Sequence, residues 1–190
     1  MKSNYSKIMM FSTVCIVINI VFGTLVGMLK IPLIFMDTMG TILAAALFGP
    51  LWGAVVGLLT NVIIGITTNP VDIPFALVNM TIGIIVGLIS KKVGFGFKTA
   101  IATGLLLAVI APLIGTPIAI WIYGGLTGSS MDFFFAWLLA SGESIFTSAF
   151  VPRIAGNLID KVASCLVAYV IITRLPKDYL KGALTNVKKQ

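Results

Sequence analysis

The polar residues with the most regular spacing lie in an apolar run near the C-terminal end of the chain. Asn157, Asp160, Lys161, Ser164 and Cys165 follow one another at i, i+3, i+4, i+7 and i+8, which places them on one face of a helix. Because the other faces are apolar, we expect this face to line a cavity and to bind a solute through Asn157 and Lys161. For Lys161 two alternatives stand beside this role, extension to the outer membrane interface and pairing with Asp160.

A second group of candidate binding residues lies earlier in the chain. Phe75 and Asn79 are four residues apart in an apolar run, so they share a helix face that carries one amide. Asn79 either contacts a ligand or bonds a neighbouring helix, and only the second role is expected of Asn61. Asp37 lies at the outer mouth of another apolar run and is a further candidate, because carboxylates are rare at such positions.

Aromatic residues and one acid complete the candidate site. Trp121, Tyr123 and Trp137 fall near the expected outer interface, where aromatic belts are common. They are also suited to stacking against a planar heterocycle. Glu143 lies in a Ser-Gly-Glu-Ser stretch and is either a cap of the pocket or a solvated loop acid.

Covalent chemistry is not indicated. The chain has no His, and its two cysteines, Cys15 and Cys165, each lie inside an apolar run, which argues against a metal site or a disulfide framework. No GxxxxGK[ST], HExxH or GxSxG motif is present. We therefore expect a binding or transport protein that is not an enzyme and holds no metal or cofactor. Because the chain has no ATPase motif of its own, any energised transport must draw on an ion gradient or on another protein.

Composition shows which elements must position these residues. Of the 190 residues 58% are hydrophobic and 10% are charged, a balance that a soluble domain of this size could not bury. The sequence therefore predicts an all-α integral membrane protein with a single transmembrane domain at 1–190 in the lipid bilayer. The net charge of +7 does not indicate nucleic acid, because most cations fall in a few short hydrophilic gaps.

The apolar runs predict six transmembrane helices. Gly49-Pro50 divides a run that is too long for one span of about 20 residues, and the two short halves could instead form a re-entrant hairpin. The expected helices cover about 8–29, 33–48, 51–67, 73–90, 99–123 and 154–173. They leave an external loop at 124–152, with an amphipathic or shallowly inserted helix, and a cytoplasmic tail at 174–190.

Charge placement predicts the orientation. With six spans, one side of the membrane receives ten basic residues and one acid, and the other receives three basic residues and five acids. The positive-inside rule then places the N and C termini in the cytoplasm. A seventh span at 131–150 would export the Lys-rich tail.

The segment Lys30–Ser90 resembles the substrate-binding S components of energy-coupling factor (ECF) transporters. It has a short proline-bearing loop before Asp37, the turn Phe-Gly-Pro-x-x-Gly-x-x-x-Gly-Leu beginning at Phe48, and Asn61 in the next helix. The riboflavin-type S components are similar here. Residues 153–161, after Pro152, resemble the start of the sixth helix of the same group.

The resemblance implies an ECF S-component-like bundle in the cell membrane that binds a vitamin or related small molecule in an outward-facing pocket. Helices 4 to 6 and the external loops after helices 1, 3 and 5 would form that pocket. A membrane T subunit and two cytoplasmic ATPases would be its partners. Many members carry Ala-x-x-x-Ala in helix 1 for the T subunit, and this chain has Ser12 as a nearby small residue instead. Spacings such as Gly53-x-x-x-Gly57 allow close helix contacts, and most such patterns serve packing within a bundle. A partner subunit could instead dock on small residues, and the candidates for this contact are Ser12, Ala44, Ala45, Gly49, Gly53 and Gly57.

Two functions remain open at this point. An S component binds its substrate tightly but needs partners for uptake, whereas a stand-alone secondary transporter would use an ion gradient through Asp37, Asp160 or Glu143. The first is favoured, because no inverted pair of interrupted spans is evident. The scarcity of fixed cations favours a neutral or weakly charged heterocycle of the vitamin, nucleobase or nucleoside class over a polyanion.

Overall fold

The computed structural model describes residues 2–29, 34–128 and 131–176, and every regular element in these ranges is helical. The elements are α1 (Lys2–Leu29), α2 (Met39–Phe48), α3 (Pro50–Thr67), the 3-10 helix η1 (Pro70–Phe75), α4 (Ala76–Val93), α5 (Phe97–Tyr123), α6 (Asp132–Ala140) and α7 (Ile145–Arg174).

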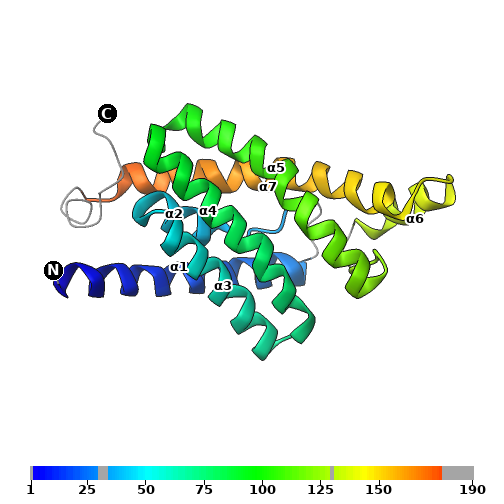
Figure 1. Cartoon of the computed structure of the whole chain (residues 1–190), viewed down its shortest axis with the longest axis horizontal. Helices are drawn as coiled ribbons and strands as arrows, with labels where there is room; N and C mark the ends of the chain where they lie inside the picture. The colour runs from blue at the N-terminus through cyan, green and yellow to red at the C-terminus, as the bar shows by residue number, and fades with distance from the viewer. Residues whose placement is uncertain (1, 30–33, 129–130, 177–190) are drawn as a thin grey trace.

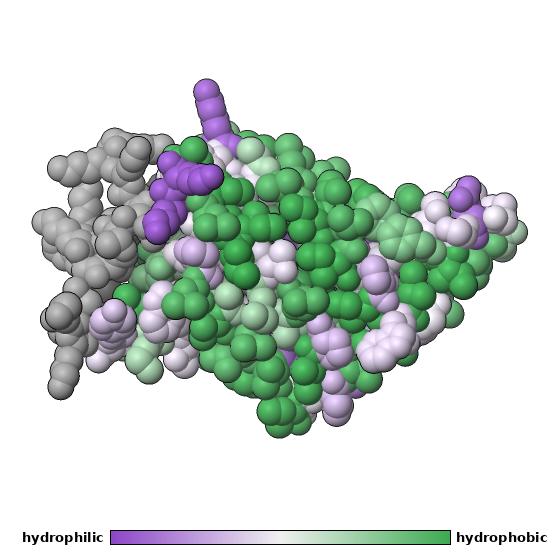
Figure 2. Space-filling view, viewed as in Figure 1, coloured by the Kyte–Doolittle hydropathy of each residue, from purple (hydrophilic) through white to green (hydrophobic). Residues whose placement is uncertain are grey.

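Five segments of the described chain are long and apolar enough to cross a membrane. They are Tyr5–Leu29, Pro50–Thr67, Pro70–Val93, Phe97–Tyr123 and Ile145–Arg174. The shortest has 18 residues and would be about 27 Å long as an α-helix, close to the hydrocarbon thickness of a bilayer. Figure 2 shows a broad apolar surface over the middle of the molecule, as expected of helices that face lipid.

Helix α2 corrects one expected boundary. The helix expected at 33–48 begins at Met39; position 33 lies outside the described residues. The backbone N–H groups of Phe35 and Met36 donate to the carboxylate of Asp160 rather than to a helix, and Met36 has a positive φ of 52°. The ten residues of α2 span about 15 Å, too short to cross alone.

Helix α7 corrects the other boundary. The last helix, expected at 154–173, begins at Ile145 because Ser144 caps it, its Oγ accepting a hydrogen bond from the N–H of Thr147 at 3.1 Å. Pro152 lies inside the helix, which membrane helices tolerate. The expected loop at 124–152 therefore contains the whole of α6 and the first turns of α7.

Glycines bring α3 and α4 into backbone contact. A Cβ built on Gly83 would lie 2.3 Å from the carbonyl carbon of Gly53, and one on Gly57 would lie 2.6 Å from the backbone of Asn79. Larger residues could not occupy these positions without moving a helix. This contact fixes the position of Asn79 along the axis of α3.

The long helices run back and forth, so their ends gather at two ends of the bundle. The start of α1, the turn between α4 and α5, and the end of α7 lie at the same end, on the left in Figure 1. Exposed basic residues at these element ends are Lys7, Lys91, Lys92, Lys98 and Arg174. The η1 segment and α6 lie toward the opposite end (Figure 1).

Candidate functional site

A buried ion pair on α7 holds the segment before α2. The Oδ1 of Asp160 accepts the N–H groups of Phe35 and Met36 at 2.8 and 2.7 Å, while its Oδ2 lies 2.6 Å from the Nζ of Lys161. Asp160 and Lys161 are both buried. Since each charge has an opposite charge and further hydrogen bonds, the pair can remain ionised away from water.

Lys161 makes two more contacts with the same segment. Its Nζ donates to the Oγ1 of Thr38 at 2.9 Å and lies 3.5 Å from Oδ1 of Asp37. The structure therefore brings together two predicted site residues, Asp37 and Lys161. It also confirms the alternative that Lys161 pairs with Asp160. Because the Lys161 side chain is buried, it does not extend to the membrane interface.

The side-chain amides of α3 and α4 form a chain of hydrogen bonds in which each donor and each acceptor can be assigned. The backbone carbonyl of Asp72 can only accept, and it lies 3.3 Å from Nδ2 of Asn61. The Oδ1 of Asn61 therefore accepts from Nδ2 of Asn79, at 3.0 Å. This arrangement leaves the Oδ1 of Asn79 buried and without a hydrogen-bond partner. An unpaired buried acceptor is costly and indicates a missing donor.

Two aromatic residues lie on the side of this amide that faces η1 and the end of α5. Phe75 is one helical turn before Asn79 and stacks on Tyr123 of α5, with ring centroids 6.4 Å apart and an interplanar angle of 29°. The Tyr123 hydroxyl lies beside the carboxylate of Asp72. The structure thus places the predicted residues Phe75, Asn79 and Tyr123 around the start of α4 and the end of α5.

Two hydroxyls that sequence reasoning missed lie at a similar height. Thr116 of α5 and Ser148 of α7 are buried with unpartnered oxygens. A Cβ on Gly104 of α5 would lie 2.7 Å from Cα of Val162, so α5 and α7 are in contact at these two residues. Counted from this contact, Thr116 lies about 18 Å further along α5, and Ser148 lies about 21 Å back along the antiparallel α7. A Cβ on Gly115 would lie 3.5 Å from a methyl group of Val78, next to Asn79. Three helices therefore carry unpartnered polar atoms at about one level.

The other predicted binding residues do not join this group. The Nδ2 of Asn157 donates to the carbonyl of Arg153, one turn earlier in its own helix, at 2.9 Å. Trp121 and Trp137 are 83% and 61% exposed, and Glu143 is exposed between α6 and α7. Such exposure fits an aromatic belt and a solvated loop acid.

The residues expected to face a partner are buried inside the helical bundle. Ser12, Ala44 and Ala45 are buried, and the three glycines Gly49, Gly53 and Gly57 are buried as well. Gly53 and Gly57 serve the contact with α4, which accounts for their small size. The expectation of a docking face at these six positions is therefore corrected.

Asn19 is a buried polar residue that sequence reasoning missed. Its Nδ2 donates to the hydroxyls of Thr41 at 2.9 Å and Thr60 at 3.1 Å, and its Oδ1 accepts from the N–H of Gly40 at 2.6 Å. It thereby joins α1 to α2 and α3. The signal was present, because Asn19 is the one amide within the apolar run 8–29.

No group of three or more His, Cys, Asp and Glu side chains that could hold a metal occurs among residues 2–29, 34–128 and 131–176. Cys15 and Cys165 are free and buried. The chemistry that this arrangement supports is non-covalent binding by a few polar atoms in an apolar bundle.

Comparison with known proteins agrees with this picture. The family model described as "ECF transporter, substrate-specific component" matches residues 7–172. No curated protein and no solved structure matches the chain. The family match covers most of the chain, including nearly all of each long apolar segment. The chain therefore belongs to the family of substrate-specific components of ECF transporters, which are multi-pass membrane binding subunits rather than enzymes.

Proposed function

We propose that this chain captures a small, neutral or weakly charged heterocycle at the outer face of the plasma membrane. The ligand belongs to the vitamin, nucleobase or nucleoside class, and a membrane T subunit with two cytoplasmic ATPases drives its delivery inward. The chain crosses the membrane six times, with α2 and the segment before it together forming the shortest pass, and both termini are cytoplasmic. The clustering of exposed basic residues at one end of the bundle supports this orientation.

The observation that carries the proposal is the unpartnered Oδ1 of Asn79. Asn79 is 3% exposed, and its Nδ2 is already used on Asn61. The ligand must therefore supply an N–H or O–H group to this oxygen. Ring N–H, amino and hydroxyl groups are common donors on vitamins, nucleobases and nucleosides.

The surroundings favour a planar ligand of low charge. Phe75 and Tyr123 already form a flat aromatic stack beside Asn79, a suitable neighbour for a heterocyclic ring. The two basic residues of α7 that are not fully exposed are occupied: Lys161 contacts two carboxylates, and Arg153 donates to the carbonyls of Ala149 and Gly125. A polyanion would need several free cations.

Binding to the purified chain tests the site. Small molecules that copurify are first identified by mass spectrometry, and their affinities are then measured by titration. Asn79→Leu is expected to weaken binding by about 1–3 kcal/mol, roughly 5- to 150-fold, because the ligand donor loses its acceptor. Thr81→Val is the matched control on α4, since the Thr81 hydroxyl bonds only within its own helix. Equal affinity in wild type and Asn79→Leu would contradict the proposed site.

Transport in vesicles tests the need for partners. We expect uptake only when the T subunit and both ATPases are reconstituted with the chain and supplied with ATP. Gradient-driven uptake by the chain alone would instead indicate a secondary transporter. Asp160 does not favour that alternative, because its carboxylate is neutralised by Lys161 rather than free to exchange an ion.

A further inference from the structure

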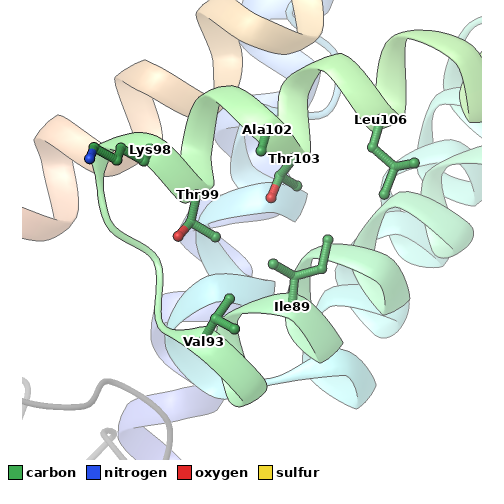
Figure 3. Close-up of a pocket in the computed structure, with 7 residues that line it drawn as sticks. All are labelled: Ile89, Val93, Lys98, Thr99, Ala102, Thr103 and Leu106. Atoms are coloured by element: carbon green, nitrogen blue, oxygen red, sulfur yellow. The ribbon is translucent and has the colours of Figure 1, made fainter.

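A shallow groove opens between α4 and α5 at the end of the bundle that carries the basic residues. Its volume is about 460 Å³, and it is lined by Ile89, Val93, Lys98, Thr99, Ala102, Thr103 and Leu106. Figure 3 shows these side chains along two neighbouring helices, with the aliphatic ones away from Lys98. The groove is therefore apolar along its length and cationic at its mouth.

Three exposed lysines lie close together in the sequence where α4 turns into α5, and one of them, Lys98, lines the groove. Lys91 and Lys92 in the last turn of α4 and Lys98 in the first turn of α5 are exposed. The sequence has no acid between Asp72 and Asp132, and none of these three lysines forms a salt bridge within the described part of the chain. A mobile anion can therefore approach them without displacing a protein carboxylate.

The first turn of α5 adds donors at the same place. No side chain caps this helix at Gly96, so no side-chain cap occupies the N–H groups of its first turn. Together with the positive end of a 27-residue helix, they favour a phosphate beside Lys98.

Thr103 provides an independent sign of a ligand within the groove. It is 1% exposed, and its hydroxyl has no hydrogen-bond partner. Figure 3 shows that this hydroxyl points into the space between α4 and α5. Thr99 lies one turn nearer the mouth, so two hydroxyls follow the groove inward from Lys98.

We propose that this groove binds one anionic phospholipid, with the phosphate at the first turn of α5 beside Lys98. The ester oxygens then meet the hydroxyls of Thr99 and Thr103, and one acyl chain lies along Ile89, Ala102 and Leu106. A free phosphate would leave the apolar part unfilled, and a neutral lipid would leave the cations unused. Assignment to the inner leaflet rests on the orientation proposed above, whereas the site itself does not.

Lipid binding to the purified full-length chain tests the proposal. Native mass spectrometry compares retention of phosphatidylglycerol and phosphatidylcholine with identical acyl chains. We expect preferential retention of phosphatidylglycerol, reduced about fivefold in Lys98→Gln. Ala102→Phe, which fills the groove, should reduce binding further. Because both variants change exposed residues, they are expected to fold, which size-exclusion profiles verify.

Two controls separate this site from general attraction to lipid. Lys7→Gln removes an exposed cation at the same end of the bundle, and Ala155→Phe adds a ring to an exposed position on α7; both should retain wild-type binding. Equal retention of the two lipids, or equal losses in Lys98→Gln and Lys7→Gln, would overturn the proposal. The assay uses neither the transported solute nor a defined membrane side, so its failure would leave the proposed function intact.

Discussion

At the residue scale, the partner of a polar group decides its role. Asp160 and Lys161 interrupt an apolar run, and sequence alone suggested that Lys161 could bind a solute. In the structure their charges compensate each other and hold Phe35 and Met36 through the backbone. The pair therefore positions the segment before α2 and contributes to the site indirectly.

We predict that Lys161→Met destabilises the protein by about 3–5 kcal/mol, because it leaves the carboxylate of Asp160 buried and unpaired. Thermal unfolding in detergent measures the effect. The double variant Lys161→Met/Asp160→Asn should recover much of the loss, since Asn keeps an oxygen for the two backbone N–H groups. A single variant as stable as wild type would show that the pair is not buried as described.

The amides show what sequence cannot decide at this scale. Asn79 and Asn157 both stand in apolar runs, and both were predicted to bind the ligand. The amide N–H of Asn157 is used within α7. Asn79 instead has an unused acceptor oxygen, because Asp72 and Asn61 determine which end of the Asn79 amide donates. That difference depends on contacts between α3, η1 and α4, which residue spacing within one helix does not contain.

At the element scale, the contact between α3 and α4 sets the height of the site. We predict that Gly83→Ala destabilises the protein by about 1–3 kcal/mol, because the new Cβ meets the backbone of Gly53 rather than a flexible side chain. Gly27→Ala in α1 is the matched control, since a Cβ there meets nothing within 4 Å. It should be neutral or stabilising by about 0.5–1 kcal/mol. Equal melting temperatures for the two variants would contradict the close contact.

Sequence reasoning located the helices better than their ends. Long apolar runs and Gly49-Pro50 separated the elements correctly, because these signals lie within single segments. The late start of α2 and the early start of α7 depend on Asp160 and on the Ser144 cap. Glycine spacing at Gly53 and Gly57 correctly indicated a close contact, but it could not show whether the neighbour belongs to this chain or to a partner.

At the scale of the whole molecule, charge and apolar surface together imply a direction across the membrane. Exposed basic residues gather where α1 starts, α4 turns into α5 and α7 ends. The candidate site lies toward the other end, near η1 and the end of α5. A solute would therefore enter opposite the basic end, which under the positive-inside rule is the outer side.

Cysteine labelling in intact cells tests this direction. We predict that Glu143→Cys reacts with a membrane-impermeant maleimide, whereas Lys92→Cys reacts only after permeabilisation, because the proposed topology places the two positions on opposite sides of the bilayer. Both positions are exposed, so access to the thiol depends on the membrane rather than on burial. The wild-type chain gives the background, which should be low because Cys15 and Cys165 are buried. Labelling of Lys92→Cys but not of Glu143→Cys in intact cells would place the basic end outside and would reverse the route proposed for the solute. Equal labelling of the two variants would contradict their placement on opposite sides of the bilayer.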